Sequence, residues 1–457
     1  MDKISVKQIA DFIGGKLIGN DICITGATTD SREANDGMMF IGIKGERVDG
    51  NDFATEFLKK GGSCAVVEKD VEVPEGKTLI RVEDTKKAIR DIAEFYRTTL
   101  NIDVVAVTGS VGKTSTKEML SSVISRSFKT FATKGNFNNE IGVPLTVFQL
   151  DSSYDKAIVE MGMSNSGEIS RLTKIAKPQV AVITNIGTAH IGNLGSRENI
   201  LKAKLEVLEC LDGIAVLNGD DEYLWGAKES ISHKKIYYGI ENEGADYVAY
   251  DVVCDHKGSS FKVKLDGTEY GFYIPVVGMH HIYNAMAAII CGLHFGMKIE
   301  DIAKGVVSYQ TTGMRQKEIL IGEVKLIEDC YNASSDSMKS SLNVLKSMSA
   351  NKRSIAVLGD MLEQGDFAEE NHRLVGKYTA SSGTDTLVCV GNDAKYIADE
   401  AKKCGVGKVY EFETNLQASE FLYDYVKEGD VVLFKASRGM KLEEVSSALQ
   451  EFLKGRK

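Results

Sequence analysis

The 457-residue sequence lacks the features that mark secreted, membrane-spanning or zinc-structured proteins. Its eight cysteines are scattered, with no CxxC pair and no zinc-type cluster, so neither a disulfide framework nor a structural zinc site is predicted. No apolar run approaches the ~20 residues that cross a bilayer. The first residues, MDKISVKQIADFIGG, lack the basic and apolar segments of a signal peptide. We therefore expect a cytoplasmic protein with reduced thiols and no transmembrane segment.

Positive charge and disorder-promoting residues are also scarce. The formal net charge of −10 disfavours nonspecific binding to nucleic acid or anionic membranes, so an anionic ligand must be attracted by loop amides, lysines or metal ions. Only four prolines, no low-complexity tract and 43% hydrophobic residues indicate a folded globular chain. At roughly 100–200 residues per domain, the length predicts two to four domains. We expect three, in a monomer.

The sequence does contain a glycine-rich turn, TGSVGKT. The usual phosphate loop, GxxxxGK[ST], would need a glycine where this chain has Val107, so the loop is shortened. Gly109 and Gly112 allow successive backbone N–H groups to point inward, Lys113 can reach the β- and γ-phosphates, and Thr114 can hold magnesium. An apolar strand before the turn and an amphipathic helix after it complete the context. The turn therefore predicts nucleotide binding.

Apolar segments predict an α/β protein of three domains. Residues 1–100 mix short strands and helices in an N-terminal α/β domain. In 101–313 the segments DKAIVEMG, QVAVITNIG and GIAVLNGD read as buried strands, which predicts a central P-loop-type ATPase domain with a parallel sheet. In 314–457 the segments RSIAVLGD, TLVCVG and DVVLFKAS predict a smaller, Rossmann-like α/β domain. TTGMRQKEIL is expected to link the last two domains, with a hinge near residues 313–315.

A polar segment at 28–53 interrupts the N-terminal domain. Its glycines and aspartates suggest a ligand-facing loop followed by a strand from Met38 to Ile43. Composition alone favours a surface hairpin, and both interpretations remain open at this point.

Two polar residues follow predicted strands of the central domain. Glu160 closes KAIVE and His190 follows AVITNIGTA, so both are expected at the carboxyl edge of the sheet, where ligands of open α/β folds collect. Together with Thr114 they form a plausible shell for two magnesium ions. Lys202 and Lys204 lie further on, in the predicted helix RENILKAKLEVLE, and helical spacing does not distinguish a ligand from a solvated lysine.

Four segments of the central domain stand in a distinctive order: TGSVGKTS, KGNFNNEIGVPLTV, VEMGMSNSGEI and TNIGTAHIGNLGSRENILKAK. In that order and spacing they resemble the ATP-dependent Mur ligases of peptidoglycan synthesis. The resemblance extends over essentially the whole chain through GMHHIYNAMAA, DCYNASSDSM, VLGDMLEQG, KASRGMKLEEV and, in the first domain, DSR with the following DG.

The resemblance implies that the three domains bind a UDP-sugar-peptide, ATP and the incoming amine. It points to the member of the family that joins D-alanyl-D-alanine to UDP-N-acetylmuramoyl-tripeptide through an acyl phosphate, giving ADP, phosphate and the pentapeptide for cell-wall formation. A DNPR-type motif, expected in the diamino-acid-adding member, is absent. The third residue of the tripeptide is not predicted.

The resemblance also implies roles for individual residues. The implied contacts to ATP are Gly109, Ser110, Gly112, Lys113, Thr114, Ser115, His281, Asn284, Arg315, Asp329 and Asn332. The implied Mg²⁺ ligands are Thr114, Glu160, His190 and Lys204, the last as a carbamylated lysine. The implied catalytic residues are Lys113, Asn139, Lys204 and Arg315. The implied substrate contacts are Ser31, Arg32, Asp49 and Gly50 for the UDP-sugar, and Lys435, Ser437 and Arg438 for the dipeptide.

The chain departs from the family pattern in one place and offers one misleading motif. Ser335 stands where the pattern has a proline after YNA, which leaves the backbone less constrained there. His280 and His281 invite a metal site, but neighbouring residues on a helix point about 100° apart and do not easily share an ion.

Three alternatives stay open. A diamino-acid-adding Mur ligase or a folylpolyglutamate-type synthetase would share the central domain, although the DSR segment disfavours the folate enzyme. A non-ligating, nucleotide-regulated binding protein would not need to keep Glu160, His190 and Lys204.

Overall fold

The computed structural model describes residues 1–350 and 352–455 as an α/β chain. The chain divides into two compact units, each described here by itself. The first contains Met1–Thr108, Ser127–Val182 and Ala203–Ala215, and the second contains Gly109–Arg126, Ile183–Lys202 and Val216–Lys457. Among the described residues, no helix is both long and apolar enough to cross a membrane. The predicted α/β class is confirmed, while the domain boundaries near residues 100 and 313 stay predictions.

The N-terminal part of the first unit holds a five-stranded sheet in the order β2-β7-β6-β5-β4. The strand prediction for Met38–Ile43 is confirmed as β5, Met38–Ile41, which pairs parallel to β4. The surface-hairpin interpretation is wrong, because three of the four residues in β5 are buried and Phe40 stacks on Phe57 of α2 at 5.1 Å. The elements here are β1 Ile4–Ser5, α1 Val6–Ile13, β2 Lys16–Ile18, β3 Cys23–Ile24, β4 Gly26–Thr28, β5, η1 Gly50–Phe53, α2 Ala54–Lys59, β6 Cys64–Val67, β7 Thr78–Arg81 and α3 Thr85–Thr98.

Parallel strands form the rest of the first unit, as the sequence predicts. β10 lies between β8 and β9 and pairs parallel to both. These strands are almost continuously apolar, which is typical of a parallel sheet covered on both faces. The elements are β8 Asp103–Thr108, β9 Thr130–Ala132, α5 Gly142–Val147, β10 Lys156–Glu160, α6 Glu168–Ala176, β11 Val180–Ile183 and η2 Glu206–Leu208.

The second unit begins at Gly109, within the glycine-rich turn, and continues into the helix that follows it. The sheet strands in this part of the unit stand in the order β16-β15-β14-β13. The antiparallel end of this order, β14 to β16, has no counterpart in the sequence prediction, because these strands alternate exposed and buried residues and carry no motif. The elements are α4 Lys113–Ile124, α7 Ile191–Leu194, α8 Arg197–Leu205, β12 Ile214–Asn218, α9 Glu222–Gly226, β13 Lys234–Gly239, β14 Tyr247–Asp255, β15 Gly258–Leu265, β16 Thr268–Ile274, α10 Met279–His294 and α11 Ile299–Val307.

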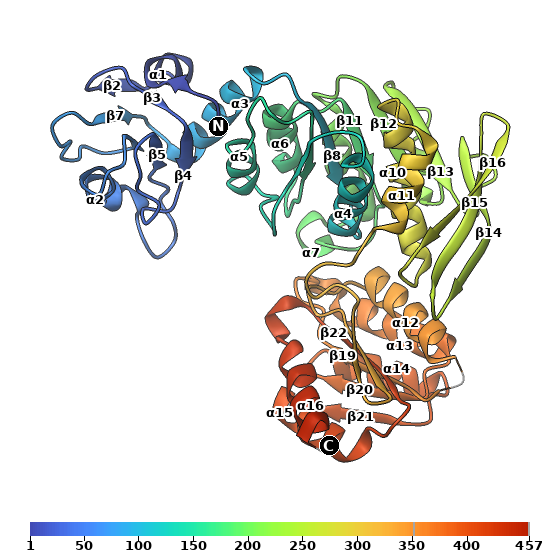
Figure 1. Cartoon of the computed structure of the whole chain (residues 1–457). Helices are drawn as coiled ribbons and strands as arrows, with labels where there is room; N and C mark the ends of the chain where they lie inside the picture. The colour runs from blue at the N-terminus through green and yellow to red at the C-terminus, as the bar shows by residue number, and fades with distance from the viewer. Residues whose placement is uncertain (351, 456–457) are drawn as a thin grey trace. The chain divides into compact units, whose positions relative to one another are not determined.

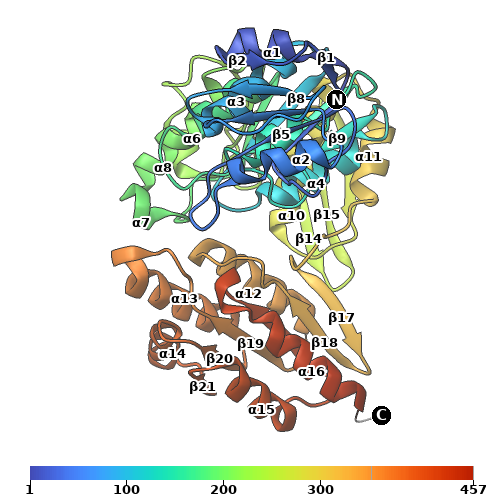
Figure 2. The same ribbon diagram turned by 90° about the vertical axis from the view of Figure 1, so that its left-hand side faces the viewer.

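The C-terminal part of the second unit is a six-stranded sheet in the order β17-β18-β22-β19-β20-β21. α12, α13 and α14 cover one face and α15 and α16 the other (Figure 1). Figure 2 shows the antiparallel β17–β18 hairpin at one edge. The elements are β17 Lys317–Ile321, β18 Val324–Glu328, α12 Ser335–Ser349, β19 Ser354–Gly359, η3 Gly365–Phe367, α13 Ala368–Ser382, β20 Thr386–Val390, α14 Ala394–Lys403, β21 Val409–Phe412, α15 Asn415–Tyr425, β22 Val431–Lys435, η4 Arg438–Met440 and α16 Glu443–Gly455.

Candidate nucleotide and metal site

The glycine-rich turn is shaped by two glycines that no other residue could replace without strain. Gly109 has φ +146°, and a Cβ there would lie 1.9 Å from Thr184 Oγ1. Gly112 has φ +87° and caps the N-terminus of α4. The Nζ atom of Lys113, the first residue of α4, donates to Gly109 O at 2.8 Å and to Ser110 O at 3.3 Å. The turn therefore leads into a helix N-terminus, with the lysine folded over its carbonyls.

The turn is anchored by residues that the sequence reasoning missed. Asn185 accepts from Val111 N at 2.9 Å through Oδ1 and donates to Val111 O at 2.9 Å through Nδ2. Thr184 Oγ1 also donates to Val111 O, at 2.6 Å. The available signal was TNIG directly after a buried strand, since such polar residues lie at the sheet edge beside the turn.

Asn284 of α10 lies against the helix that follows the turn. Its Oδ1 accepts a 2.8 Å hydrogen bond from Thr116 Oγ1 and lies 3.7 Å from the position of a Cβ on Gly112. Asn284 Nδ2 and Ser110 Oγ are buried and have no hydrogen-bond partner among the residues that the structure describes. Unmatched buried polar atoms are costly, so a cluster of them beside a phosphate-type turn fits a ligand site.

Glu160 ends β10 with a carboxylate that is only half satisfied. The residue is 2% exposed, and Oε1 accepts a 2.7 Å hydrogen bond from Asn138 Nδ2. Oε2 is buried without a hydrogen-bond partner in the described part of the chain. A fixed carboxylate with one open oxygen suits a hard cation.

Asn138, which the sequence analysis did not single out, contacts Glu160, and its neighbour Asn139 has a different use. Asn139 Oδ1 accepts from Ile141 N at 3.2 Å and Gly142 N at 2.8 Å, so its side chain caps the start of α5. The catalytic role implied for Asn139 stays a prediction.

The other implied metal ligands have distinct environments. His190 precedes α7 with a left-handed backbone, φ +62°, and its Nδ1 lies 3.4 Å from Glu363 Oε2. Lys204 of α8 is 1% exposed, so its interpretation as a solvated lysine is wrong, whereas Lys202 is exposed. Glu160 and Lys204 belong to the first unit, and Thr114 and His190 to the second. A shared two-ion site for these residues stays a prediction.

Asp329 is the centre of a polar network at the start of the C-terminal sheet. It accepts from Ser341 Oγ at 2.6 Å, Lys435 Nζ at 2.6 Å and Gln316 N at 3.3 Å. Burial acts to raise the pKa of the Asp329 carboxyl, but the Lys435 ammonium and these hydrogen bonds hold that pKa below its ordinary value. Gln316 extends the network through Oε1, which lies 3.0 Å from His281 Nε2.

The residues implied for the dipeptide are largely engaged with the C-terminal sheet itself. Lys435 is 2% exposed, Ser437 Oγ accepts from Leu362 N at 2.9 Å, and Arg438 pairs with Glu443 at 2.7 Å.

Two further implied nucleotide contacts, Arg315 and Asn332, lie at the same end of the C-terminal sheet. The Arg315 guanidinium lies 3.9 Å from the centroid of the Tyr331 ring, and Asn332 O accepts from Lys435 Nζ at 3.2 Å. The nucleotide roles of both residues, like the dipeptide contacts, stay predictions.

The implied UDP-sugar contacts lie on two loops of the N-terminal sheet. The Arg32 side chain is 87% exposed and pairs with Asp30, which lowers the pKa of the Asp30 carboxyl to about 2. Ser31 lies between them. Asp49 Oδ1 accepts from Asn51 N at 2.9 Å, so it caps η1, which begins at Gly50. Arg32 is thus a solvent-exposed cation paired with Asp30, and Asp49 stabilises the start of η1.

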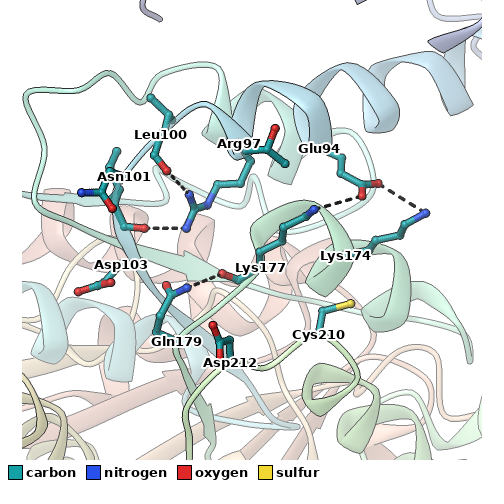
Figure 3. A pocket seen from close by; sticks show the side chains of 12 residues that line it. Glu94, Arg97, Leu100, Asn101, Asp103, Lys174, Lys177, Gln179, Cys210 and Asp212 are labelled. Atoms are coloured by element: carbon teal, nitrogen blue, oxygen red, sulfur yellow. Dashed lines mark hydrogen bonds and ion pairs between the residues drawn. The ribbon is translucent and has the colours of Figure 1, made fainter. Parts of the chain in front are cut away.

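A cavity of about 590 Å³ in the first unit lies away from these residues (Figure 3). It is lined at the start of β8 by Asp103 and at the end of α3 by Arg97, whose guanidinium donates to Ala176 O, Leu100 O and Ile102 O at 2.9, 3.0 and 2.6 Å. Glu94 at its rim pairs with Lys174 and Lys177, each at 3.5 Å. No residue implied for ATP or substrate lines it.

Three family models match the chain. They are "Mur ligase family, catalytic domain" over residues 23–97, "Mur ligase middle domain" over 107–292 and "Mur ligase, glutamate ligase domain" over 314–438. The chain belongs to the Mur ligase family. It is therefore an ATP-dependent ligase, and the hypothesis of a non-ligating, nucleotide-regulated binding protein is wrong.

Relatives within the Mur ligase family are similar over their full length. The chain is 39% identical to UDP-N-acetylmuramoyl-tripeptide--D-alanyl-D-alanine ligase of Bacillus subtilis and 32% identical to that of Escherichia coli, covering 99% of both chains in each case. Among solved structures, MurF from Acinetobacter baumannii has a TM-score of 0.91 at 31% identity, covering 99% of both chains. MurF from Thermotoga maritima in complex with ADP has a TM-score of 0.84 at 28% identity, covering 94% of this chain and 98% of that one.

Other Mur-type structures share the fold alone. A diaminopimelate-adding ligase is 17% identical with a TM-score of 0.57, and folylpolyglutamate synthase of Mycobacterium tuberculosis is 15% identical with a TM-score of 0.63.

Proposed function

We propose that the chain joins D-alanyl-D-alanine to UDP-N-acetylmuramoyl-tripeptide and converts ATP to ADP and phosphate. The observation that carries this proposal is the 39% identity over 99% of both chains to a ligase of that name. The diamino-acid-adding and folate-type alternatives rest on similarities below 20% identity, which support only the fold.

The chemistry explains why such a ligase needs a phosphate-binding turn. A carboxylate is a poor electrophile, and transfer of the γ-phosphoryl group onto it gives an acyl phosphate with phosphate as leaving group. Positioning and charge neutralisation dominate phosphoryl transfer, which suits Lys113 at the N-terminus of α4. The amine of D-alanyl-D-alanine then attacks the acyl carbon, and the tetrahedral intermediate collapses to the amide. Arg315 is proposed to approach the phosphates from the linker.

The residues present fit a magnesium requirement. Glu160 offers a buried oxygen without a hydrogen-bond partner in the described chain, and we propose Thr114, His190 and Lys204 as the further ligands. Magnesium, when bound, would neutralise charge on the phosphoryl oxygens.

A carbamate on Lys204 is part of the same proposal. Lys204 is 1% exposed, and a carbamate on its side chain would replace a cation with an anion able to hold metal. A Lys204→Ala variant is expected to lose turnover and to regain part of it with short carboxylic acids. Full activity in that variant would remove Lys204 from the mechanism.

The two substrates are proposed to bind to different parts of the chain. Ser31, Arg32, Asp49 and Gly50 are proposed to hold the UDP-sugar. Lys435, Ser437 and Arg438 are proposed to meet the dipeptide, with Lys435 acting through the end of β22 that it orders with Asp329. We further propose a monomer that works in the cytoplasm.

The test is phosphate release from ATP by the purified protein with magnesium, UDP-N-acetylmuramoyl-tripeptide and D-alanyl-D-alanine, each omitted in turn. Release only in the complete mixture, with a pentapeptide product by mass, supports the proposal. Phosphate release that does not depend on D-alanyl-D-alanine contradicts the proposal. With ¹⁸O in the substrate carboxylate, one label must appear in the released phosphate if an acyl phosphate forms.

A further inference from the structure

The loop of residues 184–190 is held by the first turn of α12. Ser335 Oγ and Thr188 Oγ1 lie 3.0 Å apart, and Asp336 Oδ2 accepts a 3.1 Å hydrogen bond from Thr188 N. Ser335 is fully buried and Thr188 is partly buried, so water competes little for the Ser335 hydroxyl. Both contacts lie within the second compact unit.

The same loop passes between α12 and the phosphate-type turn. A Cβ on Gly187 would lie 2.3 Å from Asp336 Oδ2 and 3.3 Å from Ser110 Cβ, so a side chain there would displace the Asp336 carboxylate. A shift of α12 would therefore act on Gly187, which precedes Thr188 in the chain and lies against Ser110 of the turn.

A second contact holds the far end of the loop. His190 Nδ1 lies 3.4 Å from Glu363 Oε2, and a Cβ on Gly192 would lie 3.0 Å from both Glu363 O and Gly365 N. His190 itself has a left-handed backbone at φ +62°, which is unfavourable for a non-glycine residue and persists where neighbours impose it. The C-terminal sheet thus contacts the loop on both sides of its strained residue.

We propose that the Ser335–Thr188 hydroxyl pair positions His190 for phosphoryl transfer. Ser335 is a positioning residue: it touches no reacting atom and acts by fixing Thr188, two residues before His190. The catalytic part of the inference rests on the proposed function, whereas the loop-fixing part does not.

The experiment uses Thr188→Val, Ser335→Ala and the double variant in the full-length protein. Each single change removes one hydroxyl at nearly constant shape and leaves the Thr188 N–H bond to Asp336 in place. Ser340→Ala is the matched control, because Ser340 Oγ donates to Asp336 O within the same helix. Ser335→Pro is a second test of the same position, since the first residue of a helix accepts proline and Ser334 is already extended at φ −145°, ψ 163°.

Hydrogen exchange of residues 184–195 and steady-state kinetics are the two readouts. Loss of this partly buried hydrogen bond is expected to speed exchange in this segment and to lower kcat by about 2- to 10-fold in either single variant. The double variant should be no worse than the singles, because both remove the same contact. The single variants should keep the wild-type KM for UDP-N-acetylmuramoyl-tripeptide. The Ser340→Ala control and Thr188→Ser, which keeps the hydroxyl, should both retain the wild-type exchange rate and kcat.

Two results would overturn the inference. One is unchanged exchange of 184–195 in both single variants, and the other is effects that multiply in the double variant. If the wild-type protein makes no pentapeptide, the proposed function fails, and the exchange data still decide whether the hydroxyl pair fixes the loop.

Discussion

Removal of Lys435 should destabilise the C-terminal sheet far more than removal of both members of its ion pair. Lys435 Nζ lies 2.6 Å from Asp329 Oδ2, with side-chain exposures of 3% and 18%. Breaking a buried pair leaves an uncompensated charge and costs about 3–5 kcal/mol, and we expect about 3 kcal/mol because Asp329 keeps some solvent contact. At about 3 °C per kcal/mol for a domain of this size, Lys435→Met should lower the melting temperature of the C-terminal transition by roughly 10 °C. Asp329→Asn/Lys435→Met should recover most of that loss.

The stability loss in Lys435→Met should also depend on pH, in a direction that the Asp329 pKa determines. In the wild-type protein the Asp329 pKa is held below its ordinary value, so the pair contributes stability above the unfolded pKa of about 3.9 and loses it as pH falls through the folded pKa. In Lys435→Met, burial raises the Asp329 pKa instead, so the deficit relative to wild type should be complete at pH 7 and shrink toward pH 4. Calorimetry at both pH values measures it. A deficit below about 1 kcal/mol at pH 7, or one that grows on acidification, would refute the electrostatic reasoning.

Three other outcomes follow from the contacts described. Asn138→Ala should raise the Mg²⁺ concentration for half-maximal phosphate release about tenfold, because Glu160 loses the amide that orients it; an unchanged Mg²⁺ profile would contradict this. Arg97→Lys should destabilise the protein by about 2–3 kcal/mol in urea unfolding, since one ammonium does not reach three carbonyls in different directions, and wild-type stability would show those bonds to be dispensable. Burial raises the thiol pKa of the four buried cysteines, which are Cys64, Cys291, Cys330 and Cys389, so a thiol reagent at pH 8 should label them only after unfolding. Exposed Cys23 and Cys404 should react in the folded protein, and labelling of the buried thiols before unfolding would contradict this.

Local features of the sequence predicted the elements that carry chemistry. The strand, glycine turn and helix around TGSVGKT depend on periodicity and turn residues within about 20 positions, and β10, β11, β12, β19, β20 and β22 were recognisable as short apolar runs. Contacts made across the fold were not accessible in this way. Asn138 and Asn139 are adjacent and chemically identical, and only the path of the chain before α5 decides which one reaches Glu160.

Burial and pairing of charged residues escaped the sequence for the same reason. Lys204 and Lys202 lie on one helix, yet the packing of α8 buries the first and exposes the second. Lys435 reads as a lysine at a strand end, free to meet a ligand, and its pairing with Asp329 depends on the parallel register of β18 and β22.

Gln316 determines where the connection to the C-terminal sheet can bend. Its side chain is fixed to residues that precede the linker, through the 3.0 Å contact with His281 Nε2 and a 2.7 Å hydrogen bond to Val277 O. Changes in the backbone torsions of residues 313–315 alone therefore cannot rotate the C-terminal sheet without breaking the contacts of Gln316 with His281 and Val277. The link on the other side is the longer, 3.3 Å bond from Gln316 N to Asp329. Gln316 therefore fixes the linker to His281 and Val277. A rotation of the C-terminal sheet that keeps both contacts must take place about backbone bonds between Gln316 and Lys317.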